Sequence, residues 1–60
     1  MLDLATLPVG ARVRLKDGGA AEVLENPEDG MWVLVRHLGG GAEPEGTEEL
    51  VHADQVVAAE

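Results

Sequence analysis

Few side chains in this sequence are of the types that carry out covalent chemistry. The chain has no cysteine, tyrosine or serine, so the common nucleophiles are missing. Its single lysine, Lys16, falls in a segment that we expect to be an exposed strand, and its carboxylates lie on surface-like segments where nothing would separate their pKa values. The glycine run 39–41 has neither the spacing nor the following helix of a phosphate-binding loop. We therefore expect no enzyme activity, no cofactor and no small-molecule substrate.

Two histidines, His37 and His52, are the residues that most suggest a metal ligand. Zinc sites in proteins usually have three or four ligands, whereas this sequence offers two histidines without close spacing, no cysteine and scattered glutamates. We therefore expect no metal site. His52 could instead form a local hydrogen-bonded pair with Asp54, although an aspartate in that position more commonly caps the turn with its own side chain.

An acidic cluster, consisting of Glu43, Glu45, Glu48 and Glu49, is a candidate binding surface. It could attract a basic surface on a partner protein and speed its association, or it could mimic a polyanion and inhibit a nucleic-acid-binding protein. Alternatively, it is a solvated loop whose charge keeps the chain in solution. We take these four residues, together with Trp32, as the candidate protein-binding residues.

Trp32 is the only aromatic residue of the chain. A groove for proline-rich peptides needs several aromatic side chains, and one ring does not supply it. We therefore expect Trp32 to pack as the largest residue of the core or of an interface, because large aromatic side chains bury the most apolar area.

A basic stripe is formed by Arg12, Arg14 and Lys16, because alternate residues of a strand point to the same face. Together with Arg36 they are the candidate nucleic-acid-binding residues. The net charge of −8 is unevenly distributed: the first twenty residues hold three basic and two acidic residues, whereas the rest hold one basic and ten acidic. The acidic part repels a polyanion, and no aromatic platform is present to stack bases, so nucleic-acid binding is the alternative hypothesis.

Alternation of apolar and polar residues predicts the elements that position these side chains. Residues 12–16 alternate strictly, as a half-buried strand does, and Asp17-Gly18-Gly19 predicts a hairpin turn. Residues 31–36 are the most hydrophobic run and are apolar on both faces at their start, which predicts a central strand covered on two sides. The sequence thus predicts five strands, at residues 12–16, 20–25, 31–36, 48–52 and 56–58.

Helical structure is expected to be minimal, because no segment has the roughly 10–12 residues of apolar period 3.6 that a helix requires. Residues 2–7 could form one helical turn with Asp3 near its start, which Pro8 and Gly10 would end. Residues 53–55 predict one tight turn before the last strand.

The chain length allows one domain, and five short strands in it predict an all-β fold that closes, or nearly closes, into a small barrel. We expect a single domain over residues 1–60, with an N-terminal arm at 1–9 and an acidic, glycine-rich loop at 39–47. No run approaches the roughly 18 apolar residues of a membrane span. The N-terminal residues lack the pattern of a signal peptide, so we expect a cytoplasmic protein without a membrane partner.

The order of elements resembles that of an SH3-like barrel over residues 9–59. The entry Gly10–Leu15 is followed by Asp17-Gly18 and then by Ala21-Glu22-Val23. The resemblance implies a five-stranded SH3-like barrel in which residues 53–55 form a one-turn 3₁₀ helix before the last strand.

The N-terminal half, Val9–Val23, also resembles a KOW motif, a glycine-centred unit of alternating residues found in ribosome- and RNA-polymerase-associated proteins. The KOW resemblance implies a phosphate-contacting ridge at the basic stripe.

Taken together, these patterns predict a non-enzymatic binding or accessory module whose partner is another protein or a second copy of the chain. A crude stability account for a chain this short comes out near zero, and oligomerisation is a common remedy. The doubly apolar strand needs cover, which either Leu2, Leu4, Leu7 and Val9 supply within the chain or a second copy supplies across a homodimer interface. The rival hypotheses are a KOW-like nucleic-acid or ribosome-associated module and the polyanion mimic.

Overall fold

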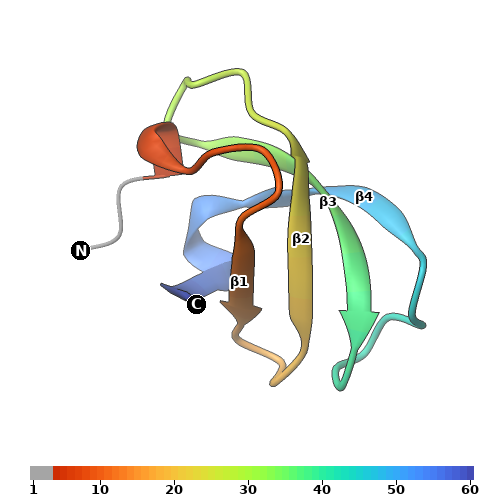
Figure 1. Cartoon of the computed structure of the whole chain (residues 1–60). Helices are drawn as coiled ribbons and strands as arrows, with labels where there is room; N and C mark the ends of the chain where they lie inside the picture. The colour runs from red at the N-terminus through yellow and green to blue at the C-terminus, as the bar shows by residue number, and fades with distance from the viewer. Residues whose placement is uncertain (1–3) are drawn as a thin grey trace.

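Five antiparallel strands form one sheet in the computed structural model, which describes residues 4–60. The strand order is β4-β3-β2-β1-β5, and each neighbouring pair is antiparallel. The all-β class and the five strands predicted from the sequence are confirmed, as is the 3₁₀ turn before the last strand. Figure 1 shows the elements η1 (Leu4–Thr6), β1 (Arg12–Leu15), β2 (Ala20–Glu25), β3 (Trp32–Gly39), β4 (Glu48–His52), η2 (Ala53–Gln55) and β5 (Val56–Ala59).

Strand β3 extends beyond the predicted residue 36 because His37 and Gly39 pair with the start of β2, and His37 also bonds to the residue before β4. The backbone N–H of His37 donates to the Thr47 carbonyl at 2.7 Å, and the His37 carbonyl accepts from the Gly46 N–H at 2.7 Å. Gly46 reverses the chain there with a φ of +94°, in the left-handed region that favours glycine. The expected loop at 39–47 is therefore the connection of a β-hairpin whose last residues already pair with β3.

The core consists of small and medium aliphatic side chains on the inner face of the sheet. Each strand contributes its alternate residues, as the burial pattern of β1, exposed-buried-exposed-buried, illustrates. Among the described residues, His37 is the one buried polar side chain, 4% exposed. The buried apolar residues are Leu4, Leu7, Val13, Leu15, Ala21, Val23, Val33, Val35, Val51 and Val56.

The sheet is strongly curved but open, which differs from the expected closure. Figure 1 shows β4 and β5 running behind the front strands, yet over residues 4–60 no ladder joins them, so they are the two sheet edges. Turn η2 lies between them and is tied to both sides: the Ala53 N–H donates to the Met31 carbonyl at 2.8 Å, and the Gln55 carbonyl accepts from the Lys16 N–H at 2.9 Å. Turn η2 thus lies where β4 and β5 would have to approach each other to pair directly.

Strand β3 has one covered face, not the two that its sequence predicted. Val33 and Val35 are fully buried, whereas Trp32 is 42% exposed and Leu34 is half-buried on the opposite face. Three of the four residues expected to cover that face are described: Leu4 and Leu7 enter the core, and Val9 is 67% exposed. Leu2 and Asp3 lie outside the described residues. Among residues 4–60, the outer face of β3 therefore has no covering segment.

The side-chain amide group of Asn26 links the N-terminal turn to the sheet. The Asn26 Nδ2 group donates to the Leu4 carbonyl at 2.9 Å and to the Leu7 carbonyl at 2.8 Å. Its Oδ1 accepts from the Glu28 N–H at 2.8 Å, which shapes the turn after β2. Asn26 therefore holds Leu4 and Leu7 in the core and orients the turn that leads into β3.

Asn26→Asp keeps the shape of this side chain but removes both donated hydrogen bonds. We expect the unfolding free energy to fall by about 1–3 kcal/mol, because the Leu4 and Leu7 carbonyl groups lose the hydrogen bonds that Asn26 donates. The midpoint of urea unfolding measures the change. Gln55→Glu, the same amide-to-carboxylate change at an exposed position, is the control, and equal midpoints for the two variants would contradict the assignment.

Candidate functional site

The outer face of β3 and β4 carries the largest exposed apolar side chains that lie side by side on neighbouring strands. Leu34 is paired with Leu50 in the β3–β4 register, and Trp32 is paired with His52. Leu50 is 58% exposed, and the Trp32 and His52 rings meet edge-to-face with centroids 4.8 Å apart. We call Trp32, Leu34, Leu50 and His52 the outer patch.

Trp32 is held at the start of β3 by the turn before it. The Asp29 Oδ1 atom accepts from the Met31 N–H at 2.8 Å and from the Trp32 N–H at 3.0 Å. These hydrogen bonds, that from Met31 first, stabilise the carboxylate and lower the pKa of Asp29. Trp32 therefore begins β3 with its backbone held by the turn, and its side chain, 42% exposed, lies outside the core.

His52 is positioned by the turn that follows β4. Its Nδ1 atom accepts from the Asp54 N–H at 3.3 Å and lies 3.1 Å from Asp54 Oδ1. The local pair considered from the sequence is thus present, but the capping roles are exchanged: His52 caps η2, and the Asp54 side chain does not. The imidazole ring is consequently held against Trp32 at the sheet edge.

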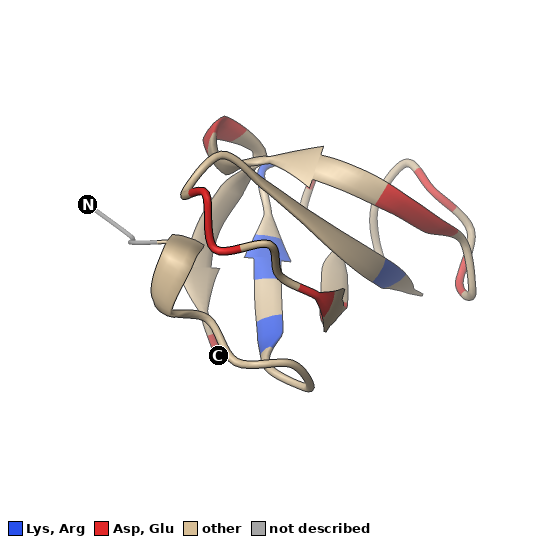
Figure 2. Cartoon of the chain, turned by 90° about the horizontal axis from the view of Figure 1, so that it is seen from above, with Lys and Arg blue, Asp and Glu red and all other residues tan. Residues whose placement is uncertain are grey.

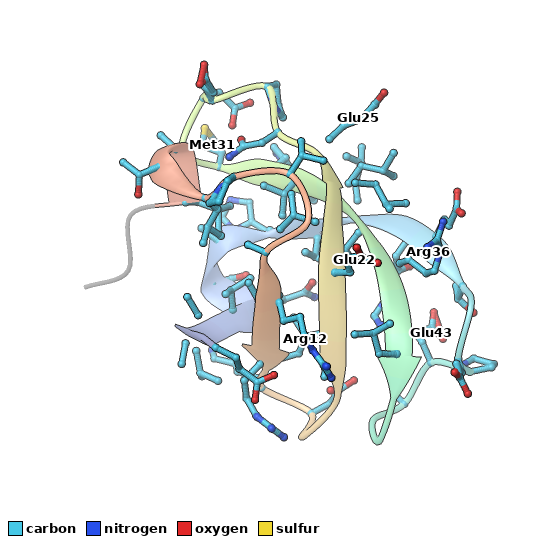
Figure 3. The ribbon with its side chains drawn as sticks, in the orientation of Figure 1. Arg12, Glu22, Glu25, Met31, Arg36 and Glu43 are labelled. Carbon is cyan, nitrogen blue, oxygen red and sulfur yellow. The ribbon has the colours of Figure 1, made fainter. Side chains whose placement is uncertain are left out.

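The outer face is charged next to the outer patch, where ion pairs join side chains of β2, β3 and β4. Arg36 lies 3.6 Å from a Glu22 carboxylate oxygen and 3.5 Å from one of Glu48. Figure 3 shows Arg36 and Glu22 side by side on neighbouring strands. All three side chains are exposed, so these pairs contribute little to stability; they define a polar border to the outer patch.

The basic stripe does not present unpaired arginines. Arg14 is 2.7 Å and Arg12 4.0 Å from Glu60 carboxylate oxygens. Within residues 4–60, no ion pair reaches Lys16. Figure 2 shows the basic positions along β1, with acidic positions distributed over the loops and β4. The four candidate nucleic-acid-binding residues are therefore one lysine and three arginines that already face carboxylates.

The acidic cluster is divided between different surfaces of the molecule. Consecutive residues of a strand point to opposite faces, so Glu48 meets Arg36 on the outer side while the Glu49 Oε1 atom lies 2.9 Å from His37 Nε2 on the inner side. Glu43 borders a hollow beside that pair, and Glu45 is exposed in the connection. The four glutamates therefore do not form one continuous surface.

The hollow at the end of the sheet has a volume of about 350 Å³ and is bordered by Lys16, Asp17, His37, Glu43 and Glu49 among others. The His37 imidazole is buried beneath it, and Glu49 satisfies its Nε2 atom. No group of three metal-ligating side chains occurs among residues 4–60.

Asp17 joins two turns that lie far apart in the sequence. Its Oδ2 atom accepts from the Ala42 N–H at 3.0 Å and its Oδ1 from the Gly19 N–H at 2.8 Å. These hydrogen bonds, that from Ala42 first, lower the pKa of Asp17. A Cβ atom at Gly41 would overlap the Asp17 carboxyl group, so glycine is required there for close approach. Sequence reasoning identified Asp17-Gly18-Gly19 as a local turn and gave no sign of the second partner.

Asp17→Asn should lower stability most near neutral pH and least in acid. Since the pKa of Asp17 is lowered in the folded chain, its contribution is fully present above the unfolded-state pKa and is lost as the pH falls below 3.8 through the folded value. Urea unfolding midpoints at pH 6 and pH 3 measure this. Asp54→Asn removes the same charge from a side chain that is 72% exposed and is the control. A gap between wild type and Asp17→Asn that stays constant down to pH 3 would contradict the prediction.

Comparison of the chain with protein-family models, with curated proteins and with solved structures gave no match. None of the helices in residues 4–60 has the length and apolar character needed to cross a bilayer. The outer patch and its charged border are accordingly the features from which a function can be argued.

Proposed function

We propose that this chain is a non-enzymatic, cytoplasmic protein-interaction module with an SH3-like architecture, and that it binds its partner through the outer patch. The observation that carries the proposal is the position of Trp32 and Leu50. Both are large apolar side chains, 42% and 58% exposed, on neighbouring strands whose inner residues complete the core without them.

The chemistry of this surface fits a protein partner. Tryptophan is among the residues that contribute most to binding energy at interfaces, because it buries a large area with few rotatable bonds. Cross-strand neighbours such as Leu34 and Leu50 lie close enough to be covered together by one partner element. The charged border at Glu22, Arg36 and Glu48 resembles the polar rim that surrounds an interface core.

The alternatives receive less support from the same geometry. A KOW-like nucleic-acid module would need its cations to face phosphates, but Arg12, Arg14 and Arg36 lie within 4.0 Å of carboxylates. A polyanion mimic would need its acids on one surface, but Glu48 and Glu49 point to opposite faces of β4.

Trp32→Ala should abolish partner binding while leaving the fold intact. The immobilised chain would be challenged with a cell lysate and with the free chain, and bound proteins identified by mass spectrometry. Proteins retained by wild type and by Val57→Ala, an exposed apolar residue of β5, should be lost from Trp32→Ala. We expect the unfolding free energy of Trp32→Ala to fall less than that of Val33→Ala, because Val33 is fully buried.

Two results would contradict the proposal. One is equal retention of every bound protein by Trp32→Ala and wild type. The other is binding of labelled RNA or DNA at low ionic strength that weakens steeply with added salt, as contacts to phosphates do. A basic nucleic-acid-binding protein lost only when Glu43 and Glu45 are neutralised would instead favour the polyanion mimic.

A further inference from the structure

Strand β4 is an edge of the sheet with β3 as its only strand neighbour in the described part of the chain. In an antiparallel ladder, hydrogen-bonded pairs alternate with pairs whose backbone groups point away from the neighbour. Backbone hydrogen bonds link His37 to Thr47 and Met31 to Ala53 at the two ends of the ladder. The register between these ends has no shift.

It follows that Glu49 and Val51 bond to β3, whereas Glu48, Leu50 and His52 direct their backbone N–H and C=O groups toward the open edge. The side chains of Glu48, Leu50 and His52 lie on the outer face, where Leu50 and His52 belong to the outer patch. Glu48, Leu50 and His52 thus present backbone groups at the open edge of the sheet and side chains on its outer face.

These three residues are complementary to a second copy of themselves. If two β4 strands pair in antiparallel orientation about Leu50, Leu50 lies opposite Leu50 of the second copy. Glu48 then lies opposite His52 of the second copy, and His52 opposite its Glu48. An imidazole N–H at His52 Nε2 would donate a hydrogen bond to such a carboxylate. A two-fold interface requires this kind of self-complementarity.

The side-chain rows of the sheet continue across such a contact. Leu34 and Leu50 are already paired within one copy, so Leu34, Leu50 and their two counterparts would form one apolar row over four strands. Each side of this apolar row would hold a second row across the four strands. Its order would be Arg36 and Glu48 of one copy, followed by His52 and Trp32 of the other. Opposite charges and apolar groups therefore lie in register, without two like charges placed directly opposite each other.

We propose that two copies of this chain associate through β4, pairing antiparallel about Leu50 to form a continuous ten-stranded sheet. This inference rests on the proposed function of the outer patch and uses its β4 residues, Leu50 and His52, for self-association, whereas Trp32 and Leu34 lie one strand away from the contact. The other sheet edge lacks a comparable arrangement, because β5 consists of valine and alanine and the adjoining Glu60 is already engaged by Arg12 and Arg14.

Oligomeric state measured by light scattering and sedimentation equilibrium tests the proposal. The wild-type chain should show a concentration-dependent mass that approaches twice 6.3 kDa. Leu50→Lys places two lysines opposite each other and should weaken the dimer at least about tenfold. Val57→Lys makes the same change at a residue of β5 with similar exposure, 54% against 58%, and should leave the dimer intact. Circular dichroism and urea unfolding check that both variants fold.

Cross-linking tests the register, because the chain has no cysteine of its own. The Cα atoms of a symmetric hydrogen-bonded pair lie about 5.5 Å apart, so a short bis-maleimide should join Leu50→Cys into a dimer. Val57→Cys should react much more slowly. Preferential linking of Val57→Cys, or equal linking of the two variants, would overturn the β4 pairing.

Salt dependence provides an independent check. Each copy carries a net charge of −8, so the two copies repel each other, and raising ionic strength from about 0.01 M to about 0.15 M should strengthen the dimer by screening that repulsion. A chain that remains monomeric at all concentrations and salt levels overturns the inference. In that case, a protein that binds the wild-type chain but not Trp32→Ala would still support the proposed function. If no such protein is found, both the proposed function and the β4 pairing are overturned.

Discussion

The alternation of side chains along β3 is the constraint on which the rest of the structure depends. Because successive residues point to opposite faces, a strand that is apolar throughout its first half must present half of those side chains away from the core. Val33 and Val35 fill the inside of the curved sheet, and Trp32 and Leu34 are placed outside it. In a chain this short no further segment of the described residues is available to cover them. The same geometry that completes the core therefore creates the outer patch.

Local patterns were sufficient to predict the strands but not their long-range relations. Period-two alternation and glycine-containing turns located all five strands, and Ala53–Gln55 forms the expected turn. Sequence could not reveal that η2 bonds to both Met31 and Lys16 and keeps β4 apart from β5. These bonds join residues that are distant along the chain, and their geometry depends on how the whole sheet curves.

The candidate site was partly visible in the sequence. Trp32 was expected to be a core or interface residue, and its exposed position on the outer face excludes the core. The acidic cluster looked continuous because its members are close in sequence, yet strand geometry separates Glu48 from Glu49. The pairing of the buried His37 with the half-buried Glu49, and the link from Asp17 to Ala42, were missed because neither has a short-range spacing. The sequence of charged residues therefore predicts the sign and the amount of charge better than it predicts where the charges lie on the surface.

The attachment of the N-terminal turn through Asn26 has a consequence for chemical ageing. Asparagine side chains commonly degrade when the backbone N–H nitrogen of the next residue attacks the side-chain amide and releases ammonia. The residue after Asn26 is Pro27, whose nitrogen carries no hydrogen. The sole asparagine of the chain is therefore protected from its usual route of deamidation at the position where the loss of its amide would release the N-terminal turn. A protein whose fold depends on one such amide can in this way keep it over a long lifetime or at high temperature.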